Sequence, residues 1–161
     1  MTTPGTIDDL FDKAIALERS AEQFYRRLAE IFASDEEVAK FWSKVADEER
    51  GHASFLDLMR GKLSPAVLSS LGNPGILEKA QRLLSTSVDD TLGRVKTLND
   101  AYRIAVELEH SETNAIFNFI LVNFPPPEFS KARAFLNVQL EKHVAAIEEG
   151  FLVKFQSRLG R

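Results

Sequence analysis

Apolar residues recur along this chain at steps of three and four positions, the spacing that puts them on one face of a helix. The first such stripe predicts a helix over about 7–32, and the second predicts a helix over about 35–60. Both begin with capping boxes, Thr6 with Asp9 and Ser34 with Glu37. Alternation of apolar and polar residues, which is typical of strands, is almost absent, so the pattern predicts an all-α protein.

Two further stripes predict helices over about 88–123 and 128–157, separated by the prolines at 125–127. The stretch 62–86 is expected to be a long crossover, with a short helix after Ser64 and Pro65. The connections within each helix pair are short, so each pair should be antiparallel. The expected architecture is an antiparallel four-helix bundle with one long crossover between the second and third helices.

The two halves of the chain resemble each other at an offset of 91 residues. Residues 14–20 lie over residues 105–111, with four of the seven positions identical. The same offset places His52 over His143. One offset therefore aligns two helices and a histidine, and we interpret this as an internal repeat.

Each predicted helix carries an ionisable residue on its inward face near mid-length. These residues are Glu18, Glu49, Glu109 and His143. Mid-helix positions of an antiparallel bundle meet at one level, and a carboxylate buried there alone costs several kcal/mol. A bound cation would remove both the burial penalty and the repulsion between carboxylates. Ordinary charged faces and hydrogen-bonded core histidines are the alternative interpretation of the same residues.

The amino-acid composition limits which side chains could form a functional site. The 161 residues contain no cysteine and three histidines, with 27% charged residues and a formal net charge of −4. Disulfides, thiolate metal sites and cysteine nucleophiles are therefore excluded within these residues, and any metal must be held by carboxylates and imidazoles. The net acidity argues against a nucleic-acid partner. The length favours one domain over 1–161.

No targeting or membrane segment is expected. The first twelve residues contain acids and no apolar core segment, unlike a signal peptide. The apolar runs are far shorter than the roughly 20 residues that span a bilayer. We therefore expect a cytoplasmic protein with no membrane partner.

Residues 49–52 form a Glu-x-x-His motif, which places Glu49 and His52 on one helix face. Two-iron bundles combine a Glu from each of two helices with a Glu-x-x-His from each of the other two. Glu18, Glu49, His52, Glu109 and His143 follow that pattern in order, and an extra carboxylate, Glu112, lies one helical turn after Glu109. On these residues the chain resembles the ferritin-like superfamily, and within it the rubrerythrin-like domain without its rubredoxin domain. The resemblance covers about residues 8–150.

The resemblance implies that these six residues hold iron, as a two-metal or a reduced single-metal site, with zinc or manganese also possible. It implies a second-shell or proton-relay role for Tyr25, peroxide reduction or ferrous iron oxidation as the activity, and electrons from an external donor. It also implies a homodimer, for which Phe32, Phe55 and Phe119 are candidate interface residues.

One position departs from the family pattern. Leu140 stands where the second Glu-x-x-His has its carboxylate, and Glu141 lies about 100° further round the helix. Glu22 could compensate, but pairing with Arg26 at i, i+4 is the simpler expectation. The alternatives left open are an altered redox site, a non-enzymatic iron- or zinc-binding bundle for storage, sensing or partner binding, and a bundle without metal.

Overall fold

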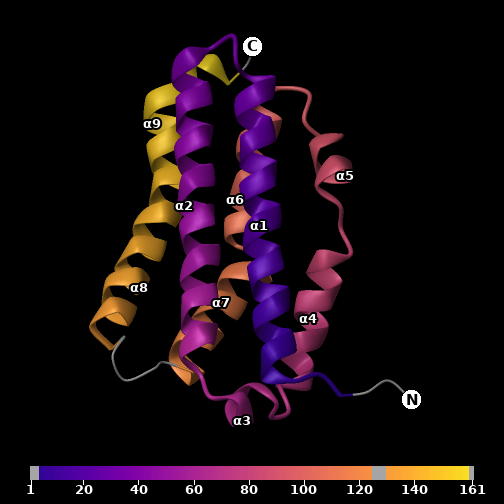
Figure 1. Ribbon diagram of the computed structural model, residues 1–161. Coiled ribbons are helices and arrows are strands. Elements are labelled where there is room, and N and C mark those ends of the chain that lie inside the picture. Colours follow the sequence, from indigo (N-terminus) through magenta and orange to yellow (C-terminus); the bar gives the residue numbers. More distant parts are fainter. Residues whose placement is uncertain (1–3, 125–129, 160–161) are drawn as a thin grey trace.

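A computed structural model describes residues 4–124 and 130–159, without the side chains of residues 112, 113 and 130–136. Helix α1 (Ile7–Ile31) and helix α2 (Glu36–Lys62) run antiparallel along most of the molecule (Figure 1). The capping box of Thr6 and Asp9 is confirmed at the start of α1. The expected cap of α2 is wrong by one residue, because the side chain of Asp35 accepts from the Val38 amide.

The crossover contains more helix than the sequence pattern predicted. Helix α3 (Pro65–Leu68) follows Ser64, as expected. Helix α4 (Pro74–Leu84) was not expected, and Asn73 caps it with Pro74 in its first turn. In Figure 1, α4 and α5 (Val88–Leu92) lie along one side of α1. The crossover therefore covers part of the bundle.

The third long helix is not continuous, which corrects the expected single helix over 88–123. It is divided into α5, α6 (Leu98–Glu109) and α7 (Glu112–Asn123). A capping box of Thr97 and Asp100 starts α6 anew. After α6 ends, the Asn114 side-chain amide donates to the main-chain carbonyl of Glu109 at 2.8 Å. This bond satisfies one of the carbonyls that a helix end leaves free.

The fourth long helix consists of α8 (Ser130–Ala145), the π-helical turn η2 (Ala146–Gly150), α9 (Phe151–Phe155) and the short 3₁₀ turn η3 (Gln156–Arg158). Of the expected range 128–157, residues 128 and 129 lie outside the described residues. With α1, α2 and α6–α7, this helix completes the expected antiparallel four-helix bundle (Figure 1). Within the described parts of the chain, no helix is long and apolar enough to cross a membrane.

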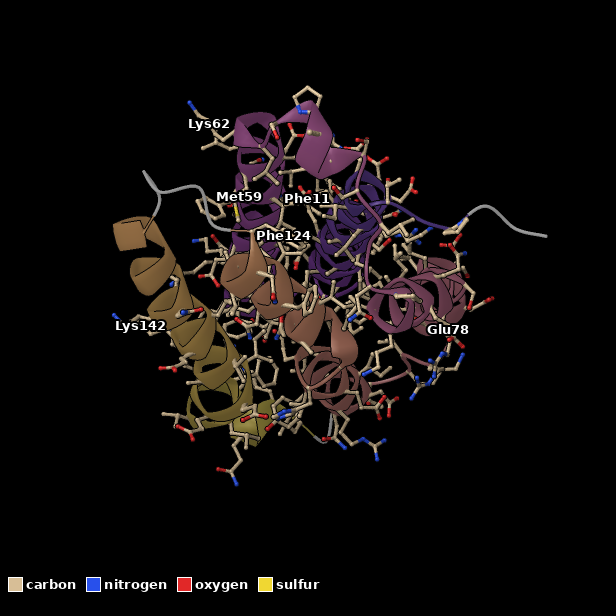
Figure 2. All side chains as sticks on the ribbon, turned by 90° about the horizontal axis from the view of Figure 1, so that it is seen from below. Phe11, Met59, Lys62, Glu78, Phe124 and Lys142 are labelled. Carbon is tan, nitrogen blue, oxygen red and sulfur yellow. The ribbon has the colours of Figure 1, made fainter. Side chains whose placement is uncertain are left out.

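The apolar core is divided into two clusters, one in each half of the bundle. The first is built around aromatic residues that include Tyr25, Trp42 and Phe151. The second contains Phe11 and Met59, which point inward in the end-on view of Figure 2 beside Phe124, whereas Lys62, Glu78 and Lys142 point outward. Buried ionisable residues lie in the same helices at the boundary between the clusters.

Candidate metal centre

Five ionisable residues are buried in the bundle, and each has at most 6% of its surface exposed. They are Glu18 on α1, Glu49 and His52 on α2, Glu109 on α6 and His143 on α8. All five were expected from the sequence on inward helix faces. The structure brings them together in two groups of three, and each group has its ligand-type atoms within 4.8 Å of one another.

The first group is formed by Glu18, Glu49 and His52. The Nδ1 atom of His52 lies 3.1 Å from Oε2 of Glu49, so these two side chains share a hydrogen bond one helical turn apart. The same Nδ1 atom lies 3.7 Å from Oε2 of Glu18, which is too long for a hydrogen bond. Glu18 thus approaches the pair without completing a bond to it.

The second group is formed by Glu49, Glu109 and His143. The Nε2 atom of His143 lies 2.8 Å from Oε1 of Glu49 and 3.3 Å from Oε1 of Glu109. Glu49 therefore belongs to both groups and turns one oxygen toward each histidine. A carboxylate shared in this way is suited to bridge two cations.

Neighbouring side chains hold His143 and Glu109 in place. Glu48 contacts Nδ1 of His143 with its Oε2 atom. The Tyr25 hydroxyl donates to Oε1 of Glu109 at 2.7 Å, and the Asn114 amide donates to Oε2 at 3.3 Å. Contacts of this kind fix the orientation of a metal ligand and the tautomer of a histidine.

Sequence reasoning missed Glu48 and Asn114. Glu48 directly precedes Glu49 and therefore lies about 100° round the helix from the face of the Glu-x-x-His motif. Helix packing nevertheless brings α8 to that face, and His143 lies between Glu48 and Glu49. No sequence pattern available here would have paired a residue with a histidine 95 positions away.

Burial and mutual contact shift the pKa values of these groups. Burial raises the pKa of Glu18 to about 8, although the nearby His52 opposes the shift. Burial alone would lower the pKa of His52, but its hydrogen bond with Glu49 and the nearby carboxylate of Glu18 raise it to about 9. Burial also opposes protonation of His143, yet its three carboxylate neighbours raise its pKa to about 12.

The same surroundings also shift the pKa values of Glu49 and Tyr25. Burial alone would raise the pKa of Glu49, but His143 and His52 hold it below the usual range. Burial and the charge of Glu109 raise the pKa of the Tyr25 hydroxyl well above its usual value. At neutral pH and without a cation, Glu49 is therefore ionised between protonated histidines, and Tyr25 keeps its proton.

One oxygen of this cluster has no partner. Among the described residues, two buried side-chain atoms lack a hydrogen bond, Oε2 of Glu18 and Nε1 of Trp42. An unpaired buried polar atom costs about 1–3 kcal/mol, so it indicates an interaction that the protein atoms do not supply. Mutual hydrogen bonds explain four members of the cluster but leave Glu18 unexplained.

The other candidate residues lie elsewhere. Leu140 is 6% exposed and packs in the second apolar cluster, and Glu141 is exposed. Glu22 forms ion pairs with Arg26 at 3.3 Å and with Arg19, as its spacing favoured. Glu112 begins α7, but its side chain lies outside the described part of the chain.

The remaining histidine, His110, and the candidate interface residues all lie outside the buried cluster. His110 is mostly exposed and pairs with Glu148 rather than with the cluster, as expected for a surface residue. The candidate interface residues are partly buried against the two apolar clusters and are not free aromatic surface. They are Phe32, Phe55 and Phe119.

Fold and site together define the class, a ferritin-like helical bundle with a buried carboxylate–histidine cluster that could hold metal. A comparison with protein families agrees, since the sequence model of the Rubrerythrin family matches residues 9–121. The match covers well over half of the chain, and the chain therefore belongs to the rubrerythrin family. Comparisons with curated proteins and with solved structures found no match.

Proposed function

We propose that this chain holds metal ions between Glu18, Glu49, His52, Glu109 and His143 and acts as a non-haem iron oxidoreductase of the rubrerythrin type. The observation that carries the proposal is the pair of three-residue groups that share Glu49. The unpaired Oε2 atom of Glu18 supports it, because a cation beside that atom would satisfy it.

The donor set fits the metals expected of such a site. It offers carboxylate oxygens and imidazole nitrogens, which suit iron, manganese and zinc, and the sequence contains no thiolate ligand. Glu18 and His52 would hold one ion, Glu109 and His143 the other, and Glu49 would bridge them. Glu112, one helical turn after Glu109, remains a proposed further ligand.

Bound ferrous iron would supply the electrons for reducing a peroxide, or for reducing oxygen as the iron itself is oxidised. Glu48 accepts a hydrogen bond from Nδ1–H of His143, so Nε2 faces Glu49 and Glu109. Tyr25 holds Glu109 through its hydroxyl, whose oxygen lies 2.7 Å from Oε1 of that carboxylate and keeps its proton. We propose Tyr25 as the proton donor to a departing oxygen.

The electrons that restore the reduced site must come from outside these residues. The 161 residues contain no cysteine, so they cannot build a thiolate-ligated iron centre of their own. The proposed partner is therefore an external electron donor that reaches the bundle surface.

A second candidate function is favoured by Leu140. Its side chain is buried in the apolar core where the family pattern has a carboxylate, so the fourth helix offers only His143 among its described residues. A site with one ligand fewer could bind iron or zinc for storage, sensing or partner binding without redox turnover.

Restoring the carboxylate separates the two candidates. We expect wild-type protein produced in iron-rich medium to contain iron and to reduce hydrogen peroxide when supplied with an artificial electron donor. A Leu140→Glu variant should hold iron more tightly and turn over peroxide faster. If the wild type binds metal but reduces peroxide no faster than free iron, the redox proposal is wrong. If Leu140→Glu then gains turnover, the non-enzymatic function stands.

A further inference from the structure

A pocket of about 330 Å³ opens beside the metal centre. Its walls come from α1, from α6 and from the crossover between α4 and α6, which in Figure 1 runs along the side of α1. Glu49 and Glu109 line its inner end together with Asn114. The pocket therefore connects the surface at the crossover to the group of Glu49, Glu109 and His143.

The pocket is apolar along its depth and polar at its mouth. Buried Leu17, Phe24 and Ile104 line its inner wall, whereas the lining residues Thr86 and Ser87 are exposed. Arg94 and Glu107 also line it, but they form an ion pair at 3.3 Å and neutralise each other. The carboxylates at the inner end are hydrogen-bonded, so nothing in the walls selects a charged ligand.

The pocket is much larger than hydrogen peroxide. One water occupies about 30 Å³ in the liquid, so the volume corresponds to roughly ten waters. Pockets that bind small organic molecules start at about 300 Å³ and have mainly apolar walls with a few polar groups at one end. This pocket matches that description, with Glu49 and Glu109 at its inner end and the hydroxyls of Thr86 and Ser87 at its mouth.

We infer that the pocket admits an uncharged organic hydroperoxide, with its hydrocarbon body against Leu17, Phe24 and Ile104 and its peroxide end at Glu109. The inference rests on the proposed function. The O–O bond breaks, two electrons and two protons are taken up, and an alcohol and water form. Ferrous iron held by the carboxylate–histidine groups would supply the two electrons, and the external donor would replace them.

Binding can be tested on metal-free protein. The probe is 2-phenyl-2-propanol, the alcohol formed from cumene hydroperoxide, titrated while methyl resonances are followed by NMR. We expect saturable shifts confined to pocket methyls such as those of Leu17 and Ile104. No saturable shift at millimolar probe, or shifts centred elsewhere, would overturn the inference.

Two variants narrow the pocket from opposite walls. Ala21→Phe fills it from α1 and Thr91→Phe from α5, and both positions line the pocket. We expect each to weaken probe binding at least tenfold, and the Thr91 variant preserves the test if a larger side chain at position 21 disturbs folding. Ala115→Phe is the matched control, because Ala115 is exposed on α7 and does not line the pocket. Equal binding by all three variants contradicts the inference.

Turnover by iron-loaded protein separates this inference from the proposed function. We expect cumene hydroperoxide to be reduced, and Thr91→Phe to raise its KM at least tenfold. Reduction of hydrogen peroxide but not of cumene hydroperoxide overturns the substrate assignment and leaves the proposed function standing. Failure with both peroxides in iron-loaded protein overturns the proposed function itself, and the probe titration then still decides whether the pocket binds organic molecules.

Discussion

Glu49 has the central position in this site. It is buried among two histidines and the carboxylates of Glu18 and Glu109, and each of its oxygens faces a different histidine. Glu18 belongs to one group only and leaves an oxygen unpaired. The two glutamates should therefore differ in what their loss does to metal binding.

The isosteric changes Glu49→Gln and Glu18→Gln test this difference. Glu49→Gln removes a charge from both groups and should reduce the bound metal to near zero. Glu18→Gln should remove about half of it, because the second group stays intact. Metal per chain after dialysis gives the answer by elemental analysis. Equal losses in the two variants would contradict the bridging role of Glu49.

The pKa shifts predict how the metal-free protein responds to pH. The folded state raises the pKa of Glu18 to about 8 and of His52 to about 9, above the values of 4.5 and 6.5 for unperturbed groups. Groups with raised values stabilise the fold at low pH, and this contribution is lost as pH rises through the folded pKa. Glu49, whose pKa is lowered, contributes a change only at acidic pH.

We therefore expect the melting temperature of chelator-treated protein to fall between pH 6 and pH 9. Thermal unfolding followed by circular dichroism measures it. A bound cation replaces the protons on these ligands, so added metal should stabilise the protein more at pH 8 than at pH 6. A melting temperature that rises with pH in the absence of metal would show that the cluster is not protonated as described.

At the scale of elements, an exposed glycine in the middle of α2 makes this helix less stable than an alanine would. Gly51 is exposed in the middle of the helix, and a Cβ atom added there would meet nothing within 4 Å. Gly51→Ala should therefore raise the free energy of unfolding by about 1 kcal/mol, the usual difference in helix propensity. Chemical denaturation measures the change.

Gly72 is the opposite case to Gly51, because a side chain added there would have no room. Its amide donates to the Gly5 carbonyl at 2.9 Å, and an added Cβ atom would lie 2.9 Å from the main-chain oxygen of Thr6. Gly72→Ala should therefore destabilise the protein, because the crossover would have to move away from the start of α1. A stabilising effect there would mean that the crossover does not pack as closely as described.

Helices with long apolar stripes could be predicted from the sequence more accurately than short or interrupted ones. The bounds of α1 and α2 could be predicted to within about two residues because their stripes are long and capped. Helix α4 was missed because it is short and begins within the sequence Gly-Asn-Pro-Gly at 72–75, which is typical of a turn. The break between α6 and α7 was missed because apolar residues at helical spacing stand on both sides of His110 and Ser111. Periodicity shows which face is apolar but not where the hydrogen-bond ladder breaks.

The sequence also predicts some residues of the candidate metal centre and not others. Five cluster members could be predicted because an ionisable residue in an apolar stripe stands out from its neighbours. The contacts of Glu48 and Asn114 could not, since they depend on how helices pack and on the break after Glu109. The pocket could not be predicted from the sequence either, because its lining residues come from six helices that only the fold brings together.

The whole molecule is organised around this polar layer. One apolar cluster packs around Trp42 and Phe151, and the other around Phe11 and Met59. Between them, the bundle buries a group of carboxylates and histidines that apolar side chains would stabilise more simply. We explain their presence by a metal ion that joins the two halves of the core.

The most direct test is anomalous X-ray scattering at the iron and zinc edges from crystals of protein produced in iron-rich medium. The proposed function predicts two peaks, one between Glu18 and His52 and one between Glu109 and His143, with Glu49 next to both. Elemental analysis of the same protein should find between one and two metal ions per chain. Less than about a tenth of an equivalent of any metal, where a specific site should fill stoichiometrically, or peaks only at other positions, would contradict it.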